Sequence, residues 1–247
     1  MVAVELSEEV VSKLETLGIR RGTYALEPLN RIQKVIAARL TEAARDIPTF
    51  PLTIDIVVDS LLAVRSHFNA TGTSHVSVND LMIKASALAL QEVPAVNSSY
   101  TPLGFVRHRH ADIAIAVGTD AGLMTPIIFA AEEKSIGQIS AEARDLSERA
   151  RSHRLKSDEY IGGTFTVSNL GMFGIANFAS IINPPHSAIL SIGAAKPIVV
   201  VESGQVRSIR SISVTLTCDH RAIDGIIGAN WLNAFRRVIE QPDQLLK

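Results

Sequence analysis

Hydrophobic residues recur along the chain with two different periods, which predict interleaved helices and strands. Helices are predicted where apolar residues recur every three or four positions, at 30–45, 60–68, 79–93, 135–151 and 226–240. Strands are predicted where β-branched and apolar residues alternate with polar ones or form short runs, at 52–58, 105–117, 164–168, 187–193 and 211–217. Because the two kinds of element alternate, we predict one α/β domain in which helices cover a mixed β-sheet.

The first 25 residues are predicted to lie outside this domain. Val10, Leu14 and Leu17 have helical spacing, and Gly18 then breaks the pattern. We expect residues 1–25 to form an N-terminal arm or extension, either packed on a neighbouring surface or unstructured. The pattern assigns no chemistry to this segment.

Composition limits the kind of partner. The 247 residues are 47% hydrophobic and 20% charged, with a formal net charge of −1, which argues against nucleic acid or an anionic membrane as the main partner. No apolar run approaches the ~18 residues that a membrane span requires, and the acidic N-terminus lacks a signal-peptide pattern. A single cysteine, Cys218, excludes an internal disulfide and a multi-cysteine metal site. We expect a soluble intracellular domain.

The most informative stretch is Cys-Asp-His-Arg-Ala-Ile-Asp-Gly at 218–225. It follows a predicted strand and precedes a predicted helix, so His220 is expected at a rigid strand-to-helix junction. Asp224 suits the N-cap of that helix, where a carboxylate accepts backbone N–H groups. A lone histidine and aspartate at this spacing would more often be a turn residue and a cap.

A second stretch, at 162–171, is Gly-Gly-Thr-Phe-Thr-Val-Ser-Asn-Leu-Gly. The predicted strand ends at Ser168, in a sharp turn that presents a hydroxyl group. Taken alone, this pattern is typical of an ordinary Ser/Asn turn.

Together the two stretches resemble the signatures of the dihydrolipoamide acyltransferases, the core components of 2-oxoacid dehydrogenase complexes. The 52-residue spacing (220 − 168) also matches that family, as do the Ile-Pro-x-Phe sequence at 47–50 and the helix pattern at 77–97. The resemblance spans 26–247 and identifies this segment as an acyltransferase catalytic domain. It implies the two-layer sandwich of chloramphenicol acetyltransferase, which has a looser His-x-x-x-Asp-Gly sequence.

The resemblance implies transfer of an acyl group between a dihydrolipoyl thiol and coenzyme A. An imidazole, with an ordinary pKa of about 6.5, is suited to take the proton of a thiol whose ordinary pKa is about 8.5. His220 is therefore the expected general base, and Ser168 the expected hydrogen-bond donor to the oxyanion. Asp224 is expected to hold the local geometry through an arginine, with Arg221, Arg31 and Arg39 as candidates.

The same resemblance gives the expected cofactor-binding residues, which are Arg65, Ser77, Asn169 and Gly193. In relatives, an arginine and a serine at the first two positions contact coenzyme A. Arg65 is equally compatible with a surface cation. Gly118 stands where the family has alanine or aspartate, so no binding role is assigned to it.

No metal site is predicted. His108 and His110 alternate within the strand predicted at 105–117, but the sequence places no carboxylate or cysteine with them. Both are expected to be exposed strand residues. His186 stands where relatives often carry glutamate and is assigned no role.

Relatives place the serine and the histidine on different subunits, so the resemblance implies a homotrimer. In the family, a C-terminal tail like that at 240–247 docks trimers into a larger cage. The expected partners are a lipoyl domain and the dehydrogenase components of the complex, in the cytoplasm or, in a eukaryote, the mitochondrial matrix. No lipoyl or peripheral-subunit-binding domain is recognisable before residue 26. The chain is therefore either an excised core or a protein that receives its lipoyl group in trans.

Two alternative functions remain open. A free-standing coenzyme A acyltransferase would act on a small alcohol or amine. A non-catalytic scaffold would keep the fold but would be expected to have lost His220 or Ser168, and both are present. The complete sequence signatures favour the dihydrolipoamide acyltransferase over both alternatives. Which acyl group it carries depends on the shape of the pocket.

Overall fold

The computed structural model describes residues 6–71, 75–120, 122–202 and 204–246. Within these residues, seven strands form one mixed sheet in the order β1-β11-β9-β8-β4-β7, with β10 also paired to β11. The strand β8 is parallel to β4 and β9, and the other pairs are antiparallel. The strands are β1 (Thr49–Val57), β4 (Ile113–Ile115), β7 (Ile127–Ile128), β8 (Phe165–Asn169), β9 (Ala188–Ile192), β10 (Lys196–Glu202) and β11 (Gln205–Asp219).

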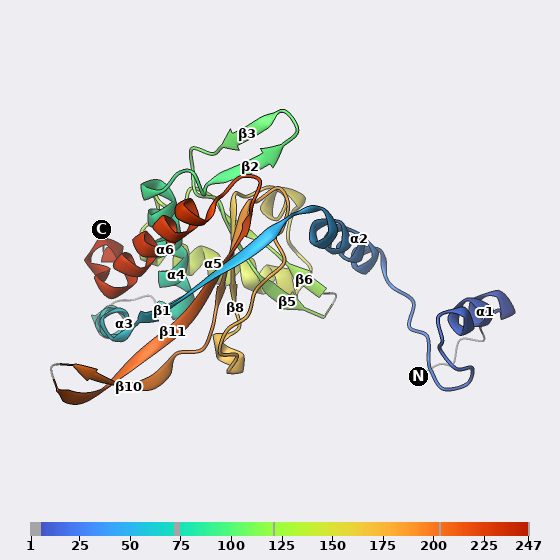
Figure 1. Cartoon of the computed structure of the whole chain (residues 1–247), viewed down its shortest axis with the longest axis horizontal. Coiled ribbons are helices and arrows are strands. Elements are labelled where there is room, and N and C mark those ends of the chain that lie inside the picture. Colours follow the sequence, from blue (N-terminus) through green and yellow to red (C-terminus); the bar gives the residue numbers. More distant parts are fainter. Residues whose placement is uncertain (1–5, 72–74, 121, 203, 247) are drawn as a thin grey trace.

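Helices cover one face of this sheet and complete a two-layer α/β sandwich, which confirms the predicted fold class. Figure 1 shows α3, α4 and α6 gathered on one side of β1 and β11, and α2 extending from the other side. The helices are α1 (Glu8–Thr16), α2 (Arg31–Asp46), α3 (Asp59–Thr71), α4 (Val78–Glu92), α5 (Ile136–Arg151) and α6 (Gly225–Glu240). None of the helices in the described part of the chain combines the length and hydropathy of a membrane span.

Local sequence explains where the helices begin. Asn30, Ser77 and Ser135 each cap a helix by accepting the backbone N–H of the residue three positions on, and that residue's side chain accepts the cap's own N–H. Such capping boxes satisfy N–H groups that have no partner within the helix. The predicted starts of α2, α4 and α5 are thereby confirmed to within two residues.

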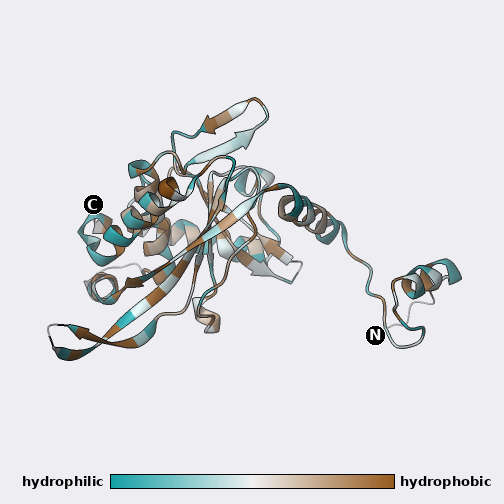
Figure 2. Ribbon diagram, in the orientation of Figure 1, coloured by the Kyte–Doolittle hydropathy of each residue, from teal (hydrophilic) through white to brown (hydrophobic). Residues whose placement is uncertain are grey.

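The core lies between the sheet and the helices. Trp231 of α6 packs against Phe165 of β8 with ring centroids 5.0 Å apart, and against Phe235 at 5.3 Å. All three side chains are fully buried. Along β1, hydrophobic and hydrophilic residues alternate (Figure 2), as expected of a strand with one covered face. This aromatic and aliphatic core fixes the strand ends that carry the candidate site.

The strand predicted at 105–117 is wrong in part, because the chain leaves the strand conformation at 108–112. It is divided among β3 (Gly104–Arg107), β4 and the first residue of β5 (Val117–Thr119). The strand β3 forms a hairpin with β2 (Ser98–Thr101), and β5 pairs with β6 (Gly122–Met124). The buried side chain of Asn97 donates to the carbonyl oxygens of His108 and His110. The carbonyl oxygens of the two histidines thus bond to a side chain and not to a neighbouring strand, and neither histidine is a strand residue.

The N-terminal segment contains the predicted helix, α1, and the described residues at 17–30 contain neither helix nor strand. Figure 1 shows α1 set away from the sheet. The strand predicted at 211–217 is longer than expected, because β11 continues through a hairpin with β10 that projects from the sheet.

Candidate active site

His220 is exposed at the junction between β11 and α6. Its backbone N–H donates to the carbonyl oxygen of Pro48 at 2.9 Å, which fixes the turn against the start of β1. Its imidazole packs on Phe50, with ring centroids 4.4 Å apart. The predicted strand-to-helix junction is confirmed, and the imidazole is supported on an aromatic surface that leaves it accessible.

Asp224 is the N-cap of α6, as predicted. Its Oδ1 accepts the backbone N–H of Ile227 at 2.8 Å, and its φ and ψ of −90° and 174° are those of an extended cap residue. The side chain is exposed and forms no ion pair with the residues that the structure describes. The predicted arginine partner of Asp224 is not Arg221, because Arg221 binds a different carboxylate.

That carboxylate belongs to Asp219, a residue to which the sequence analysis gave no role. Asp219 is buried and accepts from Nε and Nη2 of Arg221 at 2.9 and 2.8 Å in a bidentate ion pair. The carboxylate raises the pKa of Arg221. The guanidinium also lies 4.1 Å above the ring centre of Tyr100, in the β2–β3 hairpin. The backbone on both sides of His220 is therefore clamped to the sheet and to a hairpin.

Ser168 lies near the end of β8 and lines a cavity of about 600 Å³. Arg31 and Arg39, the other candidate partners of Asp224, line the same cavity from α2. Its walls are mostly apolar and come from α2, the β5–β6 hairpin and the loop before β9. The apolar side chains that line it include Val35, Ile36, Leu40, Leu123, Met124, Ile161, Phe178, Ile181 and Ile189.

Ser168 and His220 of one chain are far apart. In the parallel β8–β9 pair Ser168 aligns with Ser191, and in the antiparallel β9–β11 pair Ser191 aligns with Thr215. His220 lies five residues further along the chain (220 − 215) and two strands across the sheet. At about 3.3 Å per residue and about 4.8 Å between strands, the separation is roughly 19 Å. The two residues do not meet within one chain.

Three of the four predicted cofactor-binding residues come together at the N-terminal end of α4. Arg65 Nε donates to the carbonyl oxygen of Val76 at 3.0 Å, directly before Ser77. Asn169 Nδ2 donates to Asn79 Oδ1 at 3.3 Å, in the first turn of α4. The end of β8 that carries Ser168 is thereby joined to the helix terminus that carries Ser77.

Gly193 and Ser77 also have structural roles. A Cβ at residue 193 would lie 1.9 Å from the carbonyl oxygen of Ala176, so only glycine allows the loop after β8 to approach β9. The hydroxyl of Ser77 accepts the backbone N–H of Asp80 at 3.2 Å as the cap of α4. The cap at Ser77 follows from neighbouring residues, as expected at a helix start, whereas the contact at Gly193 depends on residues distant in the chain.

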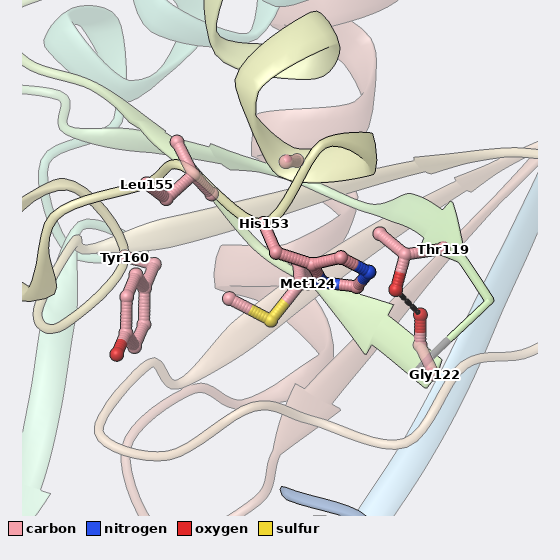
Figure 3. Close-up of a pocket in the computed structure, with 7 residues that line it drawn as sticks. Thr119, Gly122, Met124, His153, Leu155 and Tyr160 are labelled. Carbon is pink, nitrogen blue, oxygen red and sulfur yellow. Dashed lines mark hydrogen bonds between the residues drawn. The ribbon is translucent and has the colours of Figure 1, made fainter.

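A smaller cavity of about 150 Å³ adjoins the first, and Met124 and Tyr160 line both. Figure 3 shows Met124 beside the β5–β6 turn, where Thr119 Oγ1 donates to the carbonyl oxygen of Gly122 at 2.7 Å. Figure 3 also shows His153 beside this turn, and its Nε2 lies 2.7 Å from Oδ1 of Asp120. These contacts hold the hairpin that forms one wall of the cavity at Ser168.

His186, to which the sequence analysis gave no role, is buried behind the same cavity. Its Nδ1 lies 2.7 Å from Thr166 Oγ1, and its Nε2 lies 2.9 Å from the carbonyl oxygen of Gly162. Because a carbonyl only accepts, Nε2 carries the proton and Nδ1 accepts from Thr166. Burial lowers the pKa of His186 to about 4. The imidazole is therefore neutral and fixes Thr166 two residues before Ser168.

This burial predicts an acid-sensitive fold. The unfolded chain binds a proton at His186 below about pH 6.5, whereas the folded chain does so only near pH 4, so stability is lost as pH falls between these values. By pH 4 this histidine is expected to have lowered the free energy of unfolding by about 3 kcal/mol relative to neutral pH. Urea unfolding at several pH values should show this loss in the wild type and a smaller one in His186→Gln. Equal pH dependence in both proteins would contradict the assignment.

The family model for the 2-oxoacid dehydrogenases acyltransferase catalytic domain matches residues 21–247. The acetyltransferase component of the pyruvate dehydrogenase complex of Rhizobium meliloti is 43% identical over 99% of this chain and 56% of its own length. The chain thus spans about half the length of the curated relatives it matches. Chloramphenicol acetyltransferase, at 16% identity and a TM-score of 0.52, shares the fold.

Two solved structures are more similar. Azotobacter vinelandii dihydrolipoamide acetyltransferase is 30% identical, with a TM-score of 0.87 over 92% of this chain and 96% of that one. The structure of the Azotobacter enzyme addresses the role in catalysis of three residues. These are a serine, a histidine 52 residues later and an asparagine four residues after the histidine. The cubic core of a pyruvate dehydrogenase multienzyme complex gives the same identity, TM-score and coverage. The chain belongs to the acyltransferase catalytic-domain family of the 2-oxoacid dehydrogenases.

Proposed function

We propose that this chain is the catalytic core of a dihydrolipoamide acyltransferase and moves an acetyl group between a dihydrolipoyl thiol and coenzyme A. The observation that carries the proposal is the spacing of Ser168, His220 and Asp224. These residues are separated by 52 and 4 positions, as are the serine, histidine and asparagine of the Azotobacter enzyme. Residues 26–247 form the catalytic domain in this proposal, and 1–25 form an arm.

In the proposed mechanism, His220 takes the proton of the attacking thiol, and the resulting sulfur forms a bond to the thioester carbonyl carbon. Negative charge develops on the carbonyl oxygen, which accepts a hydrogen bond from the hydroxyl of Ser168. When the bond to the original sulfur breaks, the leaving sulfur receives the proton from His220. Asp224 acts indirectly by fixing the start of α6 four residues after the histidine.

The two substrates are proposed to approach Ser168 from different sides. The apolar cavity suits an uncharged lipoyl arm, because most of its lining is aliphatic or aromatic. Coenzyme A would be held at the N-terminal end of α4 by Arg65, Ser77 and Asn169, with Gly193 shaping the adjacent loop. The hydrogen bonds between this group and the end of β8 support the assignment.

We also propose a homotrimer, with each active site shared between two subunits. The separation of Ser168 and His220 within one chain supports this, since a second copy is needed to complete the site. Apolar side chains on α2 and the β10–β11 hairpin are also uncovered, with Val35 51%, Val201 73% and Val206 72% exposed. Assembly into a cage is supported by the likeness to the cubic core.

The acyl group is tested by comparing acetyl-, succinyl- and isobutyryl-coenzyme A as donors to free dihydrolipoamide. We expect acetyl transfer to have the highest kcat/KM, by about tenfold or more, because extra methylene and carboxylate groups must fit the same site. Transfer only to a small alcohol or amine would favour a free-standing acyltransferase. A folded oligomer inactive with every donor would favour a scaffold.

The partners of the proposed function are a lipoyl domain and the dehydrogenase components of the complex. Under this proposal the protein works where such complexes occur, in the bacterial cytoplasm or the mitochondrial matrix.

A further inference from the structure

A histidine and two glutamates meet outside the candidate active site, between the segment before β4 and the turn after β7. His110 Nδ1 lies 2.9 Å from Glu132 Oε1 and 3.5 Å from Glu133 Oε1. The expectation that no carboxylate joins His108 and His110 is therefore wrong for His110. The reason is the β4–β7 pairing, which returns the chain so that Ala131 N–H donates to the carbonyl oxygen of Ala111 at 3.0 Å.

The spacing of these donor atoms fits a small metal ion. One ligand atom from each of His110, Glu132 and Glu133 lies within 4.8 Å of the other two. A tetrahedral Zn²⁺ with bonds of about 2.1 Å separates neighbouring ligand atoms by about 3.4 Å. The measured separations of 2.9 and 3.5 Å lie on both sides of that value. The two separations from His110 therefore need shifts of only about half an ångström or less to match such an ion, and the two carboxylates already lie within 4.8 Å of each other.

The backbone that carries the donors is already held in place. Asn97 Nδ2 donates to the carbonyl oxygen of His110 at 2.9 Å, and the N–H of Ala111 donates to Glu132 Oε2 at 2.9 Å. The buried Lys84 donates to the carbonyl oxygens of Glu132 and Lys134 at 2.7 Å. Because Oε2 of Glu132 is held by this backbone N–H, Oε1 faces His110 with little freedom. Such fixed partners favour the binding of a metal ion.

We propose that His110, Glu132 and Glu133 form a surface site for a divalent transition metal, with Zn²⁺ as the fitting ion and water as the fourth ligand. One imidazole and two carboxylates suit Zn²⁺ better than Ca²⁺ or Mg²⁺, which prefer an all-oxygen shell. Two carboxylates and a neutral imidazole carry a charge of −2, which the ion cancels. The bound metal ties the segment that follows the β2–β3 hairpin to the turn before α5.

The test is calorimetric titration of the untagged full chain with ZnCl₂ at neutral pH. The wild type should bind one saturable ion per chain at this site, and His110→Ala and Glu133→Gln should each weaken it at least about tenfold. Glu132 is left unchanged because its carboxylate satisfies a backbone N–H. His153→Ala is the matched control, since this exposed histidine pairs with a single carboxylate, and its binding should equal that of the wild type.

Thermal unfolding separates metal binding from damage to the fold. Zn²⁺ should raise the Tm of the wild type and of His153→Ala, and should raise that of His110→Ala much less, because a ligand raises the midpoint only when it binds the folded chain more tightly than the unfolded one. Unchanged affinity in His110→Ala, or no saturable binding in the wild type, would overturn the site and leave a simple ion pair. Neither result depends on acyl transfer.

Discussion

Replacing His220 by alanine is expected to lower kcat/KM for acyl transfer by about 10²–10⁴-fold, the usual contribution of a general base. Without the imidazole, the attacking thiol must lose its proton to water, and only a few per cent of an ordinary thiol is ionised at neutral pH. The fold should be preserved. The side chain is exposed and packs on Phe50, and the backbone bond to Pro48 does not depend on the side chain.

Two comparisons separate a missing base from a damaged site. His67→Ala removes another exposed histidine, on α3, and should keep wild-type activity. Raising the pH toward the ordinary pKa of the thiol should recover part of the lost rate in His220→Ala, because the thiolate then forms without help. A variant that keeps most of its activity, or that gains nothing at higher pH, would remove His220 from the proposed role.

Features set by neighbouring residues could be predicted from the sequence. Asn30 and Ser77 were expected at helix starts, and each caps its helix through the residue three positions on. The place of His220 between a strand and a helix follows from the change of hydrophobic period at 218–225, and Asp224 caps α6 as expected. In each case the partner atoms lie within one turn of chain, so the pattern contains the information.

Features that join distant segments were missed. Asp219 is next to His220 in the sequence, but it is buried where β11 pairs with β1, at Thr49, and the arginine that it binds stacks on Tyr100, more than a hundred residues earlier. The neutral state of His186 follows from burial against Gly162 and Thr166. Hydrophobic periodicity is a property of one segment, so it cannot report which segments meet.

The register of the sheet separates the two proposed catalytic residues of one chain, Ser168 and His220. Ser168 lies roughly 19 Å from His220 of its own chain by strand spacing. Removing the oxyanion donor in Ser168→Ala should cost about 10²–10³-fold in kcat. If each site combines the serine of one subunit with the histidine of the next, the Ser168→Ala and His220→Ala subunits carry complementary defects. Neither homotrimer is active, but a mixed trimer contains some intact sites.

Mixing the two inactive variants in equal amounts, then unfolding and refolding them together, should restore about a quarter of wild-type activity. A site is intact when its serine comes from a His220→Ala subunit and its histidine from a Ser168→Ala subunit, and random assembly in a cyclic trimer gives each a chance of about one half. A mixture of His220→Ala with a double variant, Ser168→Ala and His220→Ala, contains no intact histidine and controls for the refolding step. If the site lay within one chain, no mixture could rebuild it, and the recovered activity would stay at the level of the single variants.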